Sequence, residues 1–102
     1  MGGIQPITAY SNEQVQFLGK YAVDEYNKKG ESYLYFIEVV NGTVLTFPRG
    51  FIINWDLQLK AKNCSDHDST ALYSTLVIEN KIAGDIEAFG SKFIAVGVMN
   101  KL

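Results

Sequence analysis

The side chains with the richest chemistry stand together in one short run, Cys64-Ser65-Asp66-His67-Asp68. A thiol or hydroxyl beside an imidazole can form a nucleophile with its general base, and the same side-chain types bind metal ions. A nucleophile and its base must converge from a rigid scaffold, however, and adjacent residues of one polar loop rarely do so. His67 is the only histidine and Cys64 the only cysteine, which leaves a zinc site short of ligands. We therefore interpret residues 63–70 as a solvated turn between two strands.

Carboxylates elsewhere in the chain do not form an acid–base pair. Asp24 and Glu25 are adjacent in a predicted helix, where neighbours in sequence do not face each other. We interpret Glu79, Asp85 and Glu87, near the last predicted strands, as charges on a solvated face. The sequence thus gives no basis for an enzyme, and we expect neither a cofactor nor a metal ion.

A different kind of chemistry is offered by the six residues Leu45-Thr46-Phe47-Pro48-Arg49-Gly50, which join two predicted strands. Phenylalanine and arginine are common at protein interfaces, and proline limits the entropy lost when a loop is fixed by a partner. The alternative is a tight turn in which Phe47 folds back onto the sheet. Both interpretations remain open at this point.

Length and composition restrict the remaining possibilities. We expect one domain over residues 1–102, because 102 residues with 47% hydrophobic content suffice for one core. A net charge of -2 without a basic cluster argues against nucleic acid as a partner, and no apolar run approaches the roughly 20 residues of a membrane span. A single cysteine excludes an internal disulfide, and we expect a monomer. The start of the sequence lacks the pattern of a signal peptide, so a cytoplasmic protein and a secreted one that has lost its signal peptide both remain possible.

One segment, residues 12–29, has every signal of a long helix. Ser11 can cap it, Gln14 completes a capping-box pattern, and Gly30 can end it in a left-handed conformation. Apolar residues recur on one face at helical spacing, widened by two aromatic residues: Val15, Leu18, Ala22, Tyr26, Phe17 and Tyr21.

After Gly30 the hydrophobic period changes to two, as expected for strands. Strand candidates are residues 32–40, 51–62, 71–79 and 92–99. The segment 51–62 alternates apolar and polar side chains, which predicts a sheet with one solvated face and one covered face. Only one helix is available to cover it. The predicted fold class is therefore α+β, with a four- or five-stranded antiparallel sheet wrapped around one long helix.

Residues 18–27, Leu-Gly-Lys-Tyr-Ala-Val-Asp-Glu-Tyr-Asn, resemble the helix signature of plant cystatins at all ten positions. Residues 34–40 and 54–62 are similar to strands of that family, and Gly2-Gly3 resembles its amino-terminal glycine pair. The resemblance covers about residues 2–98. It implies a cystatin/monellin-like fold, in agreement with the architecture expected from the pattern.

Cystatins inhibit papain-like cysteine proteases with a wedge of three segments: the amino-terminal glycines and two hairpin loops. The resemblance thus implies a papain-like cysteine protease, or another protein, as the partner. The positions of this chain that correspond to the wedge are Gly2, Gly3, Leu45, Thr46, Phe47, Pro48, Arg49, Gly50, Lys81 and Ile82. Because both hairpins belong to one sheet, we expect the three segments to converge at one end of the molecule.

Both loops depart from the family pattern. The first loop in cystatins reads Gln-x-Val-x-Gly, of which only Gly50 is matched, and the second carries Pro-Trp where this chain has Lys81-Ile82. A central interface tryptophan typically contributes about 2 kcal/mol or more to binding. We therefore expect either a cystatin-type inhibitor with a weakened or retargeted wedge, or a cystatin-fold protein-binding module that has lost protease inhibition.

The pair Asn41-Gly42 provides a test of the resemblance. Taken alone, it is a strong signal for a two-residue hairpin turn. The resemblance implies instead that the strand continues through it, with a bulge, to a turn at residues 47–50. We accordingly expect residues 35–40 to pair with residues 55–60.

Overall fold

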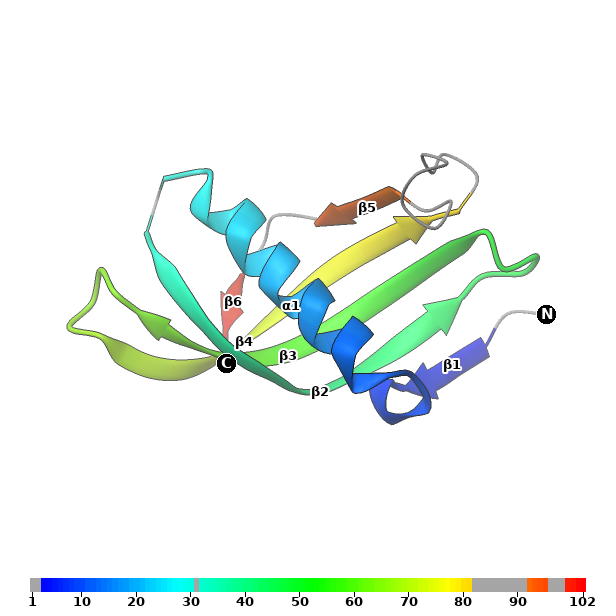
Figure 1. Ribbon diagram of the computed structural model, residues 1–102, viewed down its shortest axis with the longest axis horizontal. Helices are drawn as coiled ribbons and strands as arrows, with labels where there is room; N and C mark the ends of the chain where they lie inside the picture. The colour runs from blue at the N-terminus through cyan, green and yellow to red at the C-terminus, as the bar shows by residue number, and fades with distance from the viewer. Residues whose placement is uncertain (1–2, 31, 82–91, 96–98) are drawn as a thin grey trace.

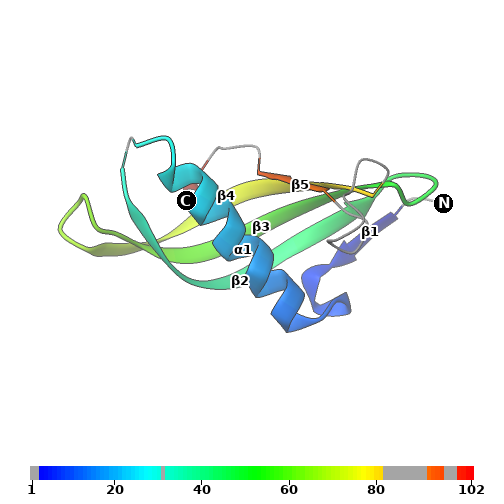
Figure 2. The same cartoon turned by 45° about the horizontal axis from the view of Figure 1, so that its top comes forward.

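The computed structural model describes residues 3–30, 32–81, 92–95 and 99–102, and their arrangement is drawn in Figure 1. In chain order the elements are β1 (Gly3–Pro6), the 3-10 turn η1 (Ile7–Ala9), α1 (Asn12–Asn27), β2 (Leu34–Thr46), β3 (Ile52–Asn63), β4 (Ser69–Asn80), β5 (Lys92–Ala95) and β6 (Asn100–Lys101). The helix crosses one face of the curved sheet (Figures 1 and 2). The expected α+β fold is therefore confirmed. Within the described residues, no helix has the length and apolar character needed to cross a membrane.

Local signals set the ends of α1. The hydroxyl of Ser11 accepts a hydrogen bond from the backbone N–H of Gln14 at 3.2 Å, as the capping pattern predicts. The helix ends at Asn27, two residues before the predicted limit, because the N–H of Lys29 turns to the carbonyl of Tyr26. Gly30 follows with φ 76°, the left-handed conformation that glycine adopts without steric cost.

The described strands form one antiparallel sheet in the order β1-β2-β3-β4-β5, with β6 also paired to β4. The strand β2 continues through Asn41-Gly42, with register shifts between Phe36 and Glu38 and between Val39 and Asn41. The predicted absence of a hairpin at Asn41 is therefore confirmed. The predicted register was wrong in detail, because residues 35–39 pair with residues 59–62. The turn after β2 extends to residue 51, so β3 begins at Ile52. Each residue of β2 therefore pairs with a residue farther along β3 than predicted.

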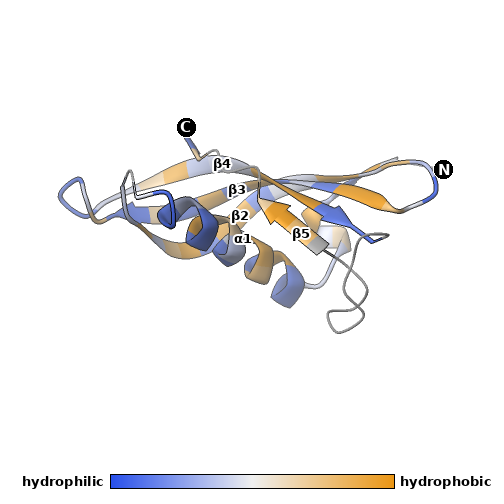
Figure 3. Cartoon of the chain, turned by 90° about the horizontal axis from the view of Figure 1, so that it is seen from above, coloured by the Kyte–Doolittle hydropathy of each residue, from blue (hydrophilic) through white to orange (hydrophobic). Residues whose placement is uncertain are grey.

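The core lies between α1 and the covered face of the sheet. The helix contributes its buried face, as predicted, and each long strand contributes alternate residues. The buried apolar residues are Val15, Leu18, Ala22, Val23, Leu34, Val39, Val44, Ile53, Trp55, Leu57, Leu59, Ala61, Tyr73 and Val77. Phe17 was expected to widen the buried helix face, but it is exposed and contacts the ring of Phe93 at 6.2 Å between centroids. In Figure 3 the long strands carry apolar and hydrophilic colours in turn, whereas the loop between β3 and β4 is hydrophilic.

Close approach of α1 to β2 explains the small residue in the helix signature. A Cβ atom added at Gly19 would lie 2.3 Å from Cγ2 of Val39 and 2.9 Å from Cε1 of Phe36. The helix therefore rests on the bulged part of β2 at a position where only glycine fits without a shift of its neighbours.

Candidate functional site

Three segments that are distant in sequence meet at one end of the sheet, on the right of Figure 1. In β1, Gly3 pairs with Thr46 and Ile4 with Leu45, which places the amino-terminal segment beside the end of β2. The N–H of Lys81 donates to the carbonyl of Phe51 at 2.8 Å, which places the end of β4 beside the β2–β3 turn. We call this region, formed by β1, residues 45–51 and Lys81, the loop end. Of the residues expected here from sequence, Gly2 and Ile82 lie outside the described residues.

The β2–β3 turn is closed by its own backbone. The N–H of Phe47 donates to the carbonyl of Ile52 at 3.0 Å, and the N–H of Gly50 donates to the carbonyl of Phe47 at 2.9 Å. Arg49 and Gly50 have φ values of 80° and 69°, so two successive residues adopt the left-handed conformation at the tip. This geometry leaves the side chains of Pro48 and Arg49 exposed.

Two phenylalanines flank the tip. Phe47 is 39% exposed and Phe51 is 44% exposed, so neither belongs to the buried core. Phe47 is thus neither fully folded onto the sheet nor fully extended into solvent. Sequence reasoning missed Phe51, which it placed at the start of the next strand. The symmetrical Phe-Pro-Arg-Gly-Phe pattern is the signal that could have identified it.

Leu45 and Thr46 form the stem of the turn rather than its tip. Both are half-buried, and Leu45 pairs with Asn54 on one side and with Ile4 on the other. Ile4 is a second residue that sequence reasoning missed. It is 71% exposed on the edge strand β1, although isoleucine is usually buried. An exposed apolar side chain beside a loop that could meet a partner is a candidate interface anchor.

Among the described residues, two exposed charged side chains lie at the loop end, and both are positive: Arg49 and Lys81. Such peripheral charges affect the rate of association with an oppositely charged partner more than the lifetime of the complex. The loop end is therefore an apolar surface bordered by positive charge.

Behind the loop end lies a cluster of the buried residues Trp55 and Glu79 and the half-buried Tyr10. Trp55 is 1% exposed, and its Nε1–H donates to Oε1 of Glu79 at 3.1 Å. The ring of Tyr10 meets that of Trp55 edge-on, with 4.9 Å between centroids. Glu79 was expected on a solvated face, and this prediction was wrong because the residue is only 5% exposed. In the alternation of β4, Glu79 falls on the same face as the buried Thr75 and Val77.

The run from Cys64 to Asp68 lies far from the loop end, in the turn between β3 and β4 at the opposite end of the sheet (Figure 1). Every residue of the run is exposed, and His67 and Asp68 have positive φ values of 52° and 55°. The Ser65 hydroxyl accepts a hydrogen bond from the N–H of Tyr33 at 3.0 Å, which holds the loop against the start of β2. The interpretation of this run as a solvated turn is confirmed.

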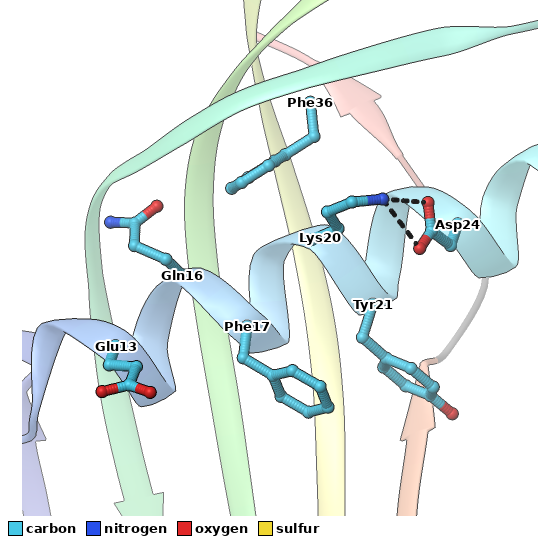
Figure 4. A pocket seen from close by; sticks show the side chains of 7 residues that line it. All are labelled: Glu13, Gln16, Phe17, Lys20, Tyr21, Asp24 and Phe36. Atoms are coloured by element: carbon cyan, nitrogen blue, oxygen red, sulfur yellow. Dashed lines mark hydrogen bonds and ion pairs between the residues drawn. The ribbon is translucent and has the colours of Figure 1, made fainter.

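A shallow hollow of about 480 Å³ lies along α1, and Figure 4 shows its lining. Its lining residues are Glu13, Gln16, Phe17, Lys20, Tyr21, Asp24 and Phe36. The ammonium of Lys20 contacts both carboxylate oxygens of Asp24, at 3.0 and 3.1 Å, and the Tyr21 hydroxyl donates to the carbonyl of Phe93 at 2.8 Å. Lys20 and Asp24 are thus paired with each other and Tyr21 with backbone, and the lining of the hollow is separate from the loop end.

Comparison with known proteins places the chain in a family. Residues 7–90 match a family model described as an aspartic acid proteinase inhibitor. The chain belongs to this family. It is also 48% identical over 42 residues to cysteine proteinase inhibitor 5 of Arabidopsis thaliana, in an alignment that covers 41% of this chain. The chain spans about a third of that relative's length, since the alignment covers 34% of it.

Both names describe protease inhibitors, and together they support a cystatin-like plant inhibitor family. The resemblance to plant cystatins is confirmed as far as membership of a cystatin-like plant inhibitor family. The comparisons therefore support a protease-inhibitor role, while the two names differ in the class of protease that is inhibited.

Proposed function

We propose that this chain is a non-catalytic protease inhibitor that inserts its loop end into the active-site cleft of the enzyme. The observation that carries the proposal is the convergence of β1, the β2–β3 turn and Lys81 at one end of the sheet. Three exposed apolar side chains, Ile4, Phe47 and Phe51, supply surface for burial in a cleft. The turn is closed by two backbone hydrogen bonds, so little conformational entropy is lost when it is bound.

We propose further that the target is an aspartic protease. The family match spans residues 7–90, whereas the match to the cysteine proteinase inhibitor spans only 42 residues. The tip of the β2–β3 turn is flanked by two phenylalanines and lacks the small Gln-x-Val-x-Gly sequence that cystatins use against papain-like enzymes. The two catalytic carboxyl groups of an aspartic protease share one proton and together carry a negative charge, which the positive charges of Arg49 and Lys81 complement.

A papain-like cysteine protease is the second candidate target. Two observations favour it: the helix signature of residues 18–27 and the 48% identity to a cysteine proteinase inhibitor over 42 residues. In this case the altered loops would give weaker inhibition than an intact cystatin wedge, because the central tryptophan is missing.

Titration of the chain against pepsin and against papain, each with a fluorogenic peptide substrate, tests both candidates. We expect inhibition of pepsin at about micromolar concentration or below and little effect on papain. Inhibition of papain alone would overturn the aspartic target. Inhibition of neither enzyme, with the chain shown to be folded at the assay pH, would favour a binding module that no longer inhibits proteases.

A matched pair of variants shows whether the loop end is responsible. Arg49→Ala alters the exposed tip, and Tyr35→Ala alters a side chain that is 61% exposed at the other end of β2. Arg49→Ala should slow association with the protease, by about tenfold or less, and Tyr35→Ala should have no effect. Equal effects of the two substitutions would mean that the protease contacts another face.

A further inference from the structure

The cluster of Tyr10, Trp55 and Glu79 connects the three elements that carry the loop end. Tyr10 follows η1, which continues directly from β1. Trp55 lies in β3 shortly after the β2–β3 turn, and Glu79 stands two residues before Lys81 in sequence. Each member of the cluster therefore belongs to the root of a different segment of the loop end.

The contacts within the cluster are directional. An indole N–H that is buried needs an acceptor, and here the acceptor is a carboxylate oxygen at 3.1 Å on the neighbouring strand. The edge-on contact between the rings of Tyr10 and Trp55 adds a preferred orientation at 4.9 Å. Burial of a carboxylate is unfavourable compared with an apolar side chain of similar size, so such groups are poor contributors to stability alone. In some proteins such groups select one arrangement among several packings.

We propose that Glu79 is a positioning residue, which through Trp55 holds the β2–β3 turn, β1 and the end of β4 in one fixed arrangement. This inference rests on the proposed function, because the arrangement matters for insertion of the loop end into a protease cleft. A partner surface that is already ordered binds without an ordering cost. An apolar residue at position 79 would fill the space, but it would provide no acceptor for the indole N–H.

Three variants separate positioning from simple packing. Glu79→Gln keeps an oxygen acceptor, Glu79→Leu removes it, and Trp55→Phe removes the donor while retaining an aromatic ring. We expect Glu79→Gln to inhibit within about threefold of the wild type, and each of the other two to lose about tenfold or more in affinity. The double variant Trp55→Phe/Glu79→Leu removes both the indole donor and the carboxylate acceptor of their hydrogen bond. It should regain thermal stability but not affinity.

Amide hydrogen exchange gives a readout that does not depend on any protease. The N–H groups of Phe47 and Lys81 close the loop end, whereas those of Cys64 and Ser69 are bonded at the opposite end of the sheet. Glu79→Leu and Trp55→Phe should speed exchange at Phe47 and Lys81 by about tenfold and leave Cys64 and Ser69 unchanged. Glu79→Gln should leave all four amides unchanged.

The outcomes distinguish the two hypotheses. If the wild type inhibits neither pepsin nor papain, the proposed function fails, and the exchange pattern still decides the positioning role. If Glu79→Leu or the double variant inhibits as well as the wild type, with unchanged exchange at Phe47 and Lys81, the positioning role is refuted. Uniformly faster exchange over the whole chain in all three variants would also refute it, because the cluster would then act only on global stability.

Discussion

Replacing Phe47 by alanine tests whether the β2–β3 turn supplies an apolar contact to a protease. Phe47 is 39% exposed, and an aromatic side chain offers about 200 Å² to burial. About 80 Å² of it is therefore available to a partner. At about 25 cal/mol per Å², its burial contributes about 2 kcal/mol, or roughly 30-fold in affinity. We expect Phe47→Ala to raise the inhibition constant by this factor.

The same substitution should also lower stability, because the rest of the side chain is covered in the free protein. The covered part, about 120 Å², sets an upper limit of about 3 kcal/mol on the loss. An unfolded chain already buries part of its apolar surface, so we expect a loss of about 1–2 kcal/mol. For a domain of this size, that corresponds to a melting temperature lower by about 5–15 °C.

Both quantities are measured on one preparation, by titration against the inhibited protease and by a urea denaturation curve. Tyr35→Ala serves as the control, because this aromatic side chain is 61% exposed and pairs near the far end of the sheet. It should leave the inhibition constant unchanged. The reasoning is refuted if Phe47→Ala lowers the free energy of unfolding while the inhibition constant stays within about threefold of the wild type.

Two further predictions concern the contact between helix and sheet. Leu18→Ala should cost about 2–5 kcal/mol in a urea titration, because Leu18 is fully buried, and a cost below about 1 kcal/mol would contradict its place in the core. Gly19→Ala should lower the free energy of unfolding by about 1–2 kcal/mol, because the new methyl group would overlap Val39 and Phe36 by more than improved helix propensity can offset. A gain in stability measured for Gly19→Ala would mean that α1 lies farther from β2 than described.

The elements of this fold were predictable because their signals are local. The cap at Ser11 and the left-handed Gly30 act within one helical turn, and both were identified from residue type and spacing. The alternation of residues 51–62 similarly predicted which face of β3 is buried. The six-residue connection 45–50 was distinctive in composition, but the sequence left open whether Phe47 contacts a partner or folds back onto the sheet.

The arrangement of these elements depended on contacts between residues distant in sequence. Asn41-Gly42 favours a hairpin locally, but β2 continues through it, because the continued strand pairs with the whole length of β3 and buries Val39 and Val44 against the helix. The register shifts within β2 could not be read from one strand, since a bulge is defined only by its partner.

The sequence by itself determined the long helix, the alternating strands and the resemblance to plant cystatins, because each of these depends on residues that are close together in the chain. Only the tertiary structure decided that Ile4 and Phe51 join Phe47 at one end of the molecule, and that Glu79 is buried behind them. From sequence alone, a glutamate near the end of a strand is predicted to be a surface charge. In the folded chain the neighbouring strand places the indole of Trp55 beside the carboxylate of Glu79. The burial of a polar group depends on its partner, and here the partner lies 24 residues away in the chain.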